Sequence, residues 1–294
     1  MPELPDITIY RDALAARIRG QVLVQIRIIN PFVLRTAVPP ITEAEGKRVL
    51  AVSRVGKRLV IAFEDDLFIV LHLMIAGRLR WLPKSARPPA RITLAILAFS
   101  DSQLAFTEAG TRRRASLHCV RGTAALEAFD MGGLEVLETD AATFAQRLRS
   151  ENHTLKRALT DPRLLSGIGN AYSDEILHRA KLSPLMLTSR LDAADSERLF
   201  EAACAVLEEW TQRLRNEAGD AFPEKVTAFR PEMAVHGKFG RPCPVCGAPV
   251  QRIVYAENEC NYCARCQNGG VILADRALSR LLHKSWPRSI DNLS

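Results

Sequence analysis

The sequence predicts an α+β fold, in which an N-terminal helix and a β-sandwich lobe precede a helical C-terminal lobe with a cysteine-rich end. Three observations predict it. Short β-branched or aromatic runs recur from residue 22 to about 120, and helical apolar spacing takes over from about 123. Five of the seven cysteines then lie between Cys243 and Cys266. At 294 residues the chain is long enough for about two domains, each with its own core.

The bulk composition is that of an ordinary globular protein, with 47% hydrophobic and 25% charged residues. The net charge of +7 and the isoelectric point near 9.2 suit a polyanionic partner, although many basic proteins bind nothing charged. No apolar run reaches the roughly 18 residues that a membrane helix needs. No secretory segment opens the chain, so we expect a cytoplasmic protein, nucleoid-associated in a prokaryote, with no membrane partner.

The first helix is predicted directly after the N-terminus. Four apolar residues follow one helical face: Ile7, Tyr10, Leu14 and Ile18. Pro5 suits the first turn, where its missing N–H costs nothing, and Gly20 lies where a helix would stop. An initiator methionine before a small residue is usually removed, and its removal would leave Pro2 with a free secondary amine.

A β-sandwich or barrel is predicted from five short runs separated by turn-like stretches. They are VLVQIRII (22–29), RLVIAFED (58–65), LFIVLHLMI (67–75), ITLAILAF (92–99) and QLAFTE (103–108). Prolines and charges predict a loop over 83–91. We place this N-terminal domain at residues 1–130.

Helices are predicted for most of the second part of the chain. Helical apolar spacing is found in 141–150, 154–161, 171–182 and 193–219. Residues 220–241 are loop-like and basic, and 274–286 predict a final short helix. The helical domain is therefore placed at 131–235, and the cysteine cluster with the last helix at 236–294.

The spacing of four cysteines is the clearest chemical signal: Cys243-x2-Cys246-x16-Cys263-x2-Cys266. Each Cys-x2-Cys pair places two thiolates on a tight turn, and two such turns close a tetrahedron around Zn²⁺. The residues between the pairs are enough for a β-hairpin. Because all four ligands come from the protein, we predict one structural Zn²⁺ rather than a catalytic one. Cys260 could also pair with Cys263, but we expect Cys260 to be spare.

A glycine-bearing turn precedes the helix predicted over 171–182. Gly167 and Gly169 flank Ile168, and Asn170 follows. Such a turn exposes backbone N–H groups at the positive end of a helix, which suits a phosphate. A helix-turn-helix linker without a ligand fits the same residues, and composition alone does not separate the two interpretations.

Together these features resemble the formamidopyrimidine-DNA glycosylase and endonuclease VIII family of base-excision repair enzymes. The matching motifs are PELPD at the start, GKR at 56–58, HLMIAGRLR at 72–80, LLSGIGNAYSDEIL at 164–177 and the four-cysteine finger. They occur in the family's order and cover nearly the whole chain. The resemblance implies a monomer with a helix-two-turns-helix motif and a zinc finger in its second lobe. It also implies that damaged DNA, double- or single-stranded, lies in a basic cleft with its lesion flipped into a pocket.

The resemblance implies a bifunctional DNA glycosylase/AP lyase whose nucleophile is Pro2. An α-amino group has a pKa near 8, against about 10.4 for lysine, so roughly a tenth of it is neutral at pH 7. A secondary amine forms an iminium directly, which is a good electron sink for β-elimination. Glu3 falls on the family's acid–base residue. Lys57 falls on its strand lysine, which grips the phosphates beside the lesion and assists the reaction; a solvated lysine is the plain alternative.

Further residues carry over from the family, each with a structural alternative. Asn170 falls on a phosphate ligand, Lys156 on a lysine at the edge of the lesion pocket, and His72 on a histidine near the DNA backbone. Glu175 falls on a glutamate beside the active site, although it could instead cap or pair within its helix. Asp6 replaces the second glutamate of the purine-specific enzymes and is one methylene shorter.

Three departures from the family bear on the substrate. The loop that fills the gap left by a flipped base has no aromatic residue here, and its candidates are Arg112, Arg113 and Arg114. The family's wedge methionine aligns with Ile75, and Met74 lies one residue earlier on what we take as a strand, facing the other way. Asn258 replaces the finger arginine that binds the lesion phosphate. These changes leave purine specificity open and suggest another opposite-base preference, or lesions in distorted or single-stranded DNA.

Two other functions fit parts of the sequence. A non-catalytic protein that binds damaged DNA would share the basic charge and the finger, but its expected mark, loss of Pro2 or Glu3, is missing. Tautomerases also use an N-terminal proline, as a general base, but they are much shorter and need no zinc finger.

Overall fold

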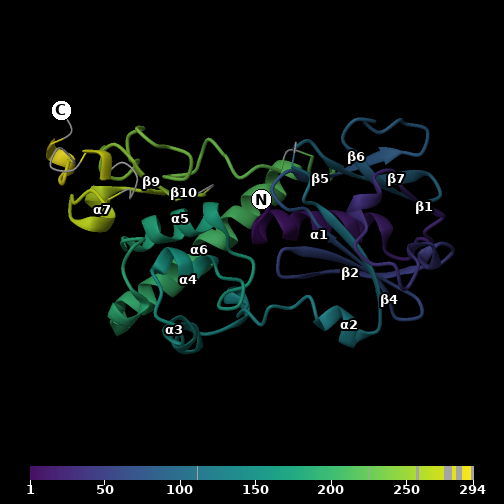
Figure 1. Cartoon of the computed structure of the whole chain (residues 1–294), viewed down its shortest axis with the longest axis horizontal. Helices are drawn as coiled ribbons and strands as arrows, with labels where there is room; N and C mark the ends of the chain where they lie inside the picture. Colours follow the sequence, from purple (N-terminus) through teal and green to yellow (C-terminus); the bar gives the residue numbers. More distant parts are fainter. Residues whose placement is uncertain (111, 225, 256–257, 275–279, 283–286, 293–294) are drawn as a thin grey trace. The chain divides into compact units, whose positions relative to one another are not determined.

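The computed structural model describes residues 1–294 except 111, 225, 256–257, 275–279, 283–286 and 293–294. The chain forms two compact units (Figure 1). Unit 1 consists of Met1–Met131 and Trp210–Thr227, and unit 2 of Gly132–Glu209 and Ala228–Ser294. Among the described residues, no helix combines the length and the apolar character needed to cross a membrane.

Helix α1 (Leu4–Ile18) opens unit 1 and confirms the predicted apolar face. Its four predicted residues have no exposed surface: Ile7, Tyr10, Leu14 and Ile18. The helix starts with a capping box, in which the backbone N–H of Glu3 donates to Asp6 Oδ2 at 3.0 Å and the Glu3 carboxylate accepts from the backbone N–H of Asp6. Pro5 lies in the first turn as predicted, and Gly20 follows the helix with φ +81°.

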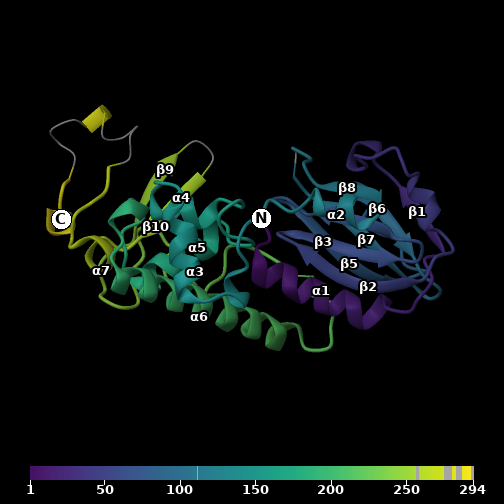
Figure 2. The same cartoon turned by 90° about the horizontal axis from the view of Figure 1, so that it is seen from below.

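Two four-stranded antiparallel sheets form the sandwich of unit 1 (Figure 2). One has the order β1-β6-β7-β5 and the other β2-β3-β4-β8. The strands are β1 (Gln25–Ile28), β2 (Val49–Val55), β3 (Arg58–Phe63), β4 (Leu67–His72), β5 (Gly77–Pro83), β6 (Thr93–Ala98), β7 (Ser102–Glu108) and β8 (Ser116–Arg121). Helix α1 packs against β2 and β3, and its apolar face joins one core with residues of both sheets. A short helix, α2 (Thr123–Glu127), follows β8.

The five predicted runs are all strands, whereas β2, β5 and β8 were not predicted. Each of these three strands interrupts its apolar residues with Arg, Ser or His. In β5, for example, Leu79 is buried while its neighbours Arg78 and Arg80 are only half-buried. Such strands have one face in the core and one toward solvent, so they lack the continuous apolar run on which the prediction depended.

The end of a long helix returns to unit 1. Helix α6 (Ala193–Ala218) contributes its residues from Trp210 onward to this unit. Leu214 is 1% exposed and belongs to the core of the sandwich. Beyond the helix, the ring of Phe222 lies 5.7 Å from that of Tyr10. Arg215 and Asp12 add a half-exposed ion pair, so unit 1 is built from two separate stretches of chain.

The helices of unit 2 match the predicted segments. They are α3 (Ala141–Arg149), α4 (Leu155–Thr160), α5 (Asn170–Ala180) and the first part of α6. Buried Phe144, Leu155 and Ile176 pack their apolar sides. Residue Gly169 is the N-cap of α5, and Gly167 before it has φ +80°, which a residue with a side chain rarely adopts.

The cysteine-rich segment forms the predicted hairpin. Its strands are β9 (Gln251–Tyr255) and β10 (Asn258–Tyr262), followed by the short helix α7 (Ala264–Asn268). Beyond α7, Ile272 and Ile290 are buried in the core of the finger, and the Leu273 N–H donates to the Tyr262 hydroxyl at 2.8 Å. Most of the final helix predicted over 274–286 lies outside the described residues.

Candidate active site

The N-terminus of unit 1 is partly enclosed and lies among four charged side chains. Pro2 and Glu3 are buried, and Met1 precedes them in the full sequence. Burial lowers the pKa of the terminal amine of Met1 below its ordinary value of 8.0. The negative charges of Glu3 and Asp6 raise this pKa, and the positive charges of Arg78 and Lys57 lower it. The net result is a lowered pKa. An amine of this kind keeps a larger neutral fraction at neutral pH.

Lys57 lies in a turn and not on a strand, which corrects the sequence interpretation. Gly56 and Lys57 form the two-residue turn between β2 and β3, and Gly56 has φ +57°, as hairpin turns require. The turn brings the Lys57 ammonium close enough to the N-terminus to affect the pKa of the terminal amine. The sequence-predicted residues Pro2, Glu3 and Lys57 are therefore neighbours.

His72 is the last residue of β4 and is half-buried, in agreement with the predicted strand. It pairs across the sheet with Arg58 of β3. Burial, with the positive charges of Arg58 and Lys57, lowers the pKa of His72 to about 4. The imidazole is therefore neutral at pH 7, and it can donate a hydrogen bond but brings no charge to an anion.

Met74 and Ile75 lie in the turn between β4 and β5, so the alternation of a strand does not apply to them. Met74 has φ +52°, which is uncommon for a residue with a side chain, and Ile75 is 59% exposed. This turn lies against the loop after β7, because a Cβ placed on Gly110 would come within 3.3 Å of the Ala76 Cβ. An exposed apolar tip therefore adjoins the arginine loop.

The three arginines of that loop are exposed. Arg113 donates to the Arg91 carbonyl at 2.9 Å. The shape of the loop depends on Glu108, which is 2% exposed and accepts hydrogen bonds from the backbone N–H groups of Arg114 and Ala115. Sequence analysis missed Glu108, although a lone carboxylate at the end of an apolar strand was a signal.

Lys156 has a buried structural role in unit 2. Its ammonium donates to the Asn170 carbonyl at 2.7 Å, to Ser173 Oγ at 2.8 Å and to Asp174 Oδ1 at 2.5 Å. The side chain is 14% exposed, and three bonds use all three of its N–H groups. The lysine thus ties α4 to the first turns of α5.

Asn170 and Glu175 also bond within unit 2. The side-chain amide of Asn170 donates to the Glu259 carbonyl of β10 at 2.7 Å. Glu175 is 6% exposed and accepts from the backbone N–H groups of three consecutive residues, Ala234, Val235 and His236, at 2.8 to 2.9 Å. The carboxylate therefore caps a loop distant in sequence, rather than pairing within its own helix.

Asp174 and His236 were missed by sequence analysis. Asp174 Oδ2 accepts from His236 Nδ1 at 2.8 Å and from the Asn261 backbone N–H at 3.1 Å. Both side chains are almost fully buried, and the His236 ring stacks on Phe229. With Lys156 on the other oxygen, Asp174 is the centre of a buried polar cluster.

The four predicted zinc ligands lie together. Their sulfur atoms are all within 4.8 Å of one another: Cys243, Cys246, Cys263 and Cys266. Two pairs are separated by 3.4 and 4.0 Å, and a tetrahedral site with Zn–S bonds of about 2.3 Å places sulfurs roughly 3.8 Å apart. The donor set fits a metal ion that prefers thiolates. Cys260 is outside the cluster, and burial raises the pKa of its thiol.

Asn258 opens β10 and pairs with Tyr255, but its side chain lies outside the described residues. Two arginines elsewhere in the finger, Arg252 and Arg265, both have acidic partners. Arg252 pairs with Glu259 at 3.3 Å and lies over the Phe239 ring, and Arg265 pairs with Asp291 at 3.0 Å. Exposed pairs of this kind are weak, so both guanidinium groups can exchange partners at low cost.

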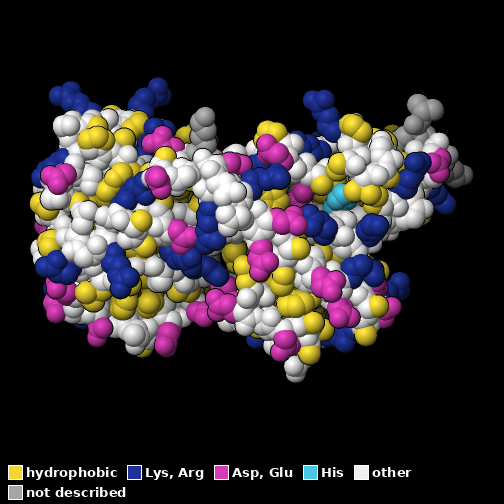
Figure 3. All heavy atoms as spheres, turned by 180° about the vertical axis from the view of Figure 1, so that it is seen from behind, with side chains coloured by type: hydrophobic (Ala, Val, Ile, Leu, Met, Phe, Trp, Pro, Cys, Tyr) yellow, Lys and Arg dark blue, Asp and Glu magenta, His cyan; other side chains and the backbone are white. Residues whose placement is uncertain are grey.

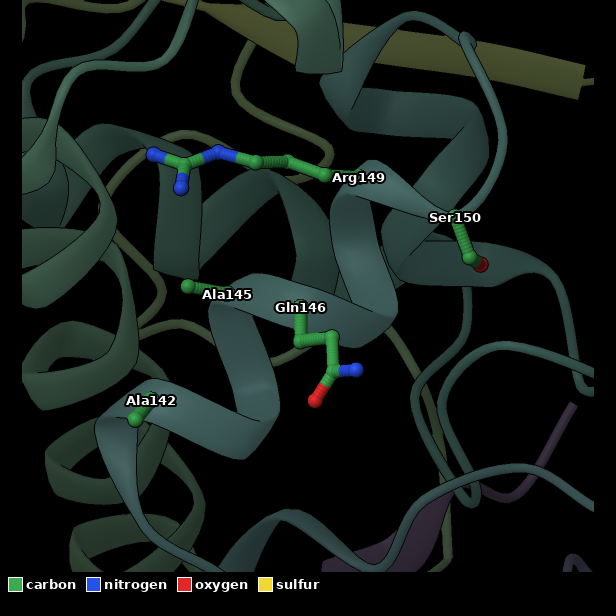
Figure 4. Close-up of a pocket in the computed structure, with 5 residues that line it drawn as sticks. All are labelled: Ala142, Ala145, Gln146, Arg149 and Ser150. Atoms are coloured by element: carbon green, nitrogen blue, oxygen red, sulfur yellow. The ribbon is translucent and has the colours of Figure 1, made fainter.

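One face of the surface and one hollow in unit 2 can be described beside these residues. Lys and Arg are interspersed with Asp and Glu on the face shown in Figure 3. A hollow of about 630 Å³ lies on α3 and its C-cap, lined by Ala142, Ala145, Gln146, Arg149 and Ser150 (Figure 4). Arg149 donates from there to the Leu191 carbonyl and Ser196 Oγ. No second titratable group is among these lining residues.

The fold and the cysteine cluster define a class of protein with an N-terminal helix and β-sandwich, a helical part and a metal-binding finger. Residues 1–117 match the family model of the formamidopyrimidine-DNA glycosylase N-terminal domain, and 133–216 that of the formamidopyrimidine-DNA glycosylase H2TH domain. The formamidopyrimidine-DNA glycosylase of Thermus thermophilus is 34% identical over 283 residues, which cover 92% of this chain and 100% of that protein. The chain therefore belongs to the formamidopyrimidine-DNA glycosylase family.

Other relatives agree with this family. An uncharacterized formamidopyrimidine-DNA glycosylase-like protein of Mycobacterium tuberculosis is 39% identical over 150 residues, covering 51% of this chain and 93% of that protein. Among solved structures, Lactococcus lactis Fpg in complex with DNA containing Fapy-dG superposes with a TM-score of 0.81 at 28% identity, covering 90% of this chain and 100% of that one. A complex of the same enzyme with DNA containing an abasic site gives 0.78 at 27% identity, with 90% and 99% covered.

Proposed function

We propose that this protein is a bifunctional DNA glycosylase/AP lyase of base-excision repair, which removes oxidised bases and nicks the strand through a Schiff base on Pro2. The observation that carries the proposal is the enclosed N-terminus, where Pro2 is buried and the preceding Met1 amine has a pKa lowered by burial, among Glu3, Asp6, Arg78 and Lys57. The similarity to glycosylases and to Fpg structures with damaged DNA supports damaged DNA as the substrate.

The chemistry begins once Met1 has been removed. The lone pair of the Pro2 nitrogen attacks C1′ of the damaged nucleotide, and the bond from C1′ to the base breaks. The base leaves with a proton and the sugar ring opens, which gives an iminium between Pro2 and C1′. Loss of a proton from C2′ then expels the 3′ phosphate, and water releases the product from the nitrogen.

Three neighbouring groups have roles in these steps. Glu3 exchanges a proton with the sugar ring oxygen as the ring opens, since its carboxylate follows directly after the nucleophile. Lys57, at the tip of the β2–β3 turn, binds the phosphate beside the lesion. Lys57 and Arg78 lower the pKa of the Met1 amine, and the same positive charges would favour the neutral, nucleophilic form of the Pro2 amine after Met1 is removed.

The remaining assignments concern binding. Ile75, exposed beside the arginine loop, enters the gap left by the flipped base, and Arg112, Arg113 and Arg114 bind the strand around it. The four-cysteine cluster holds one structural Zn²⁺, which supplies folding energy to the finger and no catalytic step.

Borohydride trapping tests the proposal. The protein is incubated with DNA that carries an abasic site, and borohydride is added to reduce any iminium to a stable covalent link. We expect a protein–DNA complex whose link maps to Pro2, and intact mass should show that Met1 is absent. A tag fused before Pro2 should abolish trapping, and the same tag at the C-terminus is the matched control. A complex that persists with the N-terminal tag would contradict Pro2 as the nucleophile.

A non-catalytic protein that binds damaged DNA is the second candidate. The observation that favours it is the capping box, which engages both Glu3 and Asp6 with backbone at the start of α1. This alternative predicts tight binding of abasic DNA with no trapped complex, so the same experiment separates the two functions.

A further inference from the structure

Helix α5 presents a polar stripe to the finger of unit 2. Asn170, Asp174 and His178 follow one another at intervals of four residues, which places them on the same helix face. The first two bond to β10, through the Glu259 carbonyl and the Asn261 backbone N–H. Figure 1 shows α5 lying beside the hairpin and α7. The third residue of the stripe reaches the cysteine cluster itself.

His178 Nε2 lies 3.3 Å from the Sγ atom of Cys243. The His178 residue is 7% exposed and Cys243 is 2% exposed, so water has little access to either group. A metal-bound thiolate can only accept a hydrogen bond. The pair is therefore bonded when Nε2 carries the proton, in either the neutral or the charged imidazole.

The hydrogen bond between His178 and Cys243 is important because the metal cluster is charged. Four thiolates around Zn²⁺ carry a net charge of −2, and a buried charge is costly unless N–H groups surround it. Cys263 receives such a bond from the backbone N–H of Cys266, at 3.4 Å. Cys243 receives its bond from a side chain on α5, 65 residues away in sequence. The hydrogen bond to the Cys243 sulfur can therefore be removed by substituting one side chain.

We propose that His178 is a positioning residue of the zinc site, which donates from Nε2 to the Cys243 thiolate and so links metal affinity to α5. The inference rests on the zinc assignment in the proposed function. His178 is not itself a ligand, since its nitrogen is outside the group of four sulfurs. His178 thus connects the zinc site to α5, the helix that also carries Asn170. Loss of zinc should therefore loosen the contact between the finger and the polar stripe of α5.

The test measures zinc affinity of the full-length protein by competition with a chromogenic chelator. His178→Phe keeps an aromatic ring but removes the donor, and we expect zinc to bind about 10- to 100-fold more weakly. His178→Gln keeps an N–H near the position of Nε2, so most of the affinity should remain. His153→Phe, in unit 2 but paired with Glu151, is the matched control and should bind zinc like the wild type.

Cobalt substitution gives a readout that a packing role would not change. Without the N–H bond the thiolate donates more charge, so the sulfur-to-cobalt absorption of His178→Phe should move to longer wavelength, while His178→Gln stays near the wild type. Equal zinc affinity in wild type and His178→Phe, or equal losses in the Phe and Gln variants, would overturn the inference. If His178→Phe does not fold, His178→Met replaces it in the same comparison. A wild-type protein without zinc would contradict the zinc assignment and the inference together.

Discussion

The N-terminal end of unit 1 and the polar face of α5 in unit 2 use their charged side chains differently. Around the N-terminus, Arg78 and Lys57 lower the pKa of the Met1 amine, which directly precedes the proposed nucleophile Pro2. On α5, Asp174 and Glu175 are held by several hydrogen bonds each, and Lys156 has all three N–H groups bonded. The first region is the proposed site of the chemistry, and the second holds the finger to the helices of unit 2. The family resemblance in the sequence had implied that residues of both regions contact the DNA.

The largest effect that would test this difference is expected at Lys156. Lys156→Met leaves the Asp174 carboxylate, which has no exposed surface, without its ammonium partner. Breaking a buried ion pair on one side costs about 3–5 kcal/mol, and we expect a loss of that size in urea unfolding. Arg179→Met, which breaks the exposed pair with Glu209, is the matched control and should cost under about 1 kcal/mol.

A Lys156→Met protein that unfolds like the wild type but binds damaged DNA poorly would contradict the structural role. In that case Lys156 would face the ligand, and the two regions would be alike in function.

Glu175 gives the next largest effect. In Glu175→Gln an NH₂ group replaces one carboxylate oxygen and faces backbone N–H groups that need an acceptor. Leaving such a donor unsatisfied costs about 1–3 kcal/mol of stability. Urea unfolding should show this loss, while the rate of borohydride trapping by the remaining folded protein should not change. Slow trapping by a fully stable Glu175→Gln protein would instead place Glu175 in the catalytic machinery.

Local patterns predicted from the sequence were reliable where the interaction partners are close in the chain. The face of α1 follows from helical periodicity, and the four cysteines follow from two short turns and a hairpin. Asp174 and His236 are 62 residues apart, so no spacing rule joins them. The family resemblance placed Lys57 on a strand, but Gly56 before it supplies the positive φ of a hairpin turn.

A smaller effect is expected at Asp6, whose carboxylate could serve either the helix cap or the chemistry. Asp6→Ala removes the acceptor for the Glu3 backbone N–H and should destabilise unit 1 by about 1 kcal/mol, as loss of a helix cap does. Asp6→Asn retains an acceptor oxygen and serves as the matched control in thermal unfolding. If both variants lose trapping activity without losing stability, Asp6 acts in the chemistry rather than in the cap.

The smallest expected effect is a change in pH dependence. The terminal amine reacts only when neutral, so the trapping rate should rise with pH and level off above the pKa of the amine. Burial, Arg78 and Lys57 lower the pKa of the Met1 amine despite Glu3 and Asp6. We expect the same surroundings to act on the Pro2 amine once Met1 is removed, so the midpoint should lie below 8.0. Arg78→Gln removes one of the lowering charges, so its midpoint should move to higher pH, with the same plateau rate. Arg80→Gln, which removes the same type of charge two residues along β5, is the matched control and should leave the midpoint unchanged. A midpoint that does not move in Arg78→Gln would show that Arg78 does not adjust the reacting amine, and Arg78 would then have no more chemical role than the charges on α5.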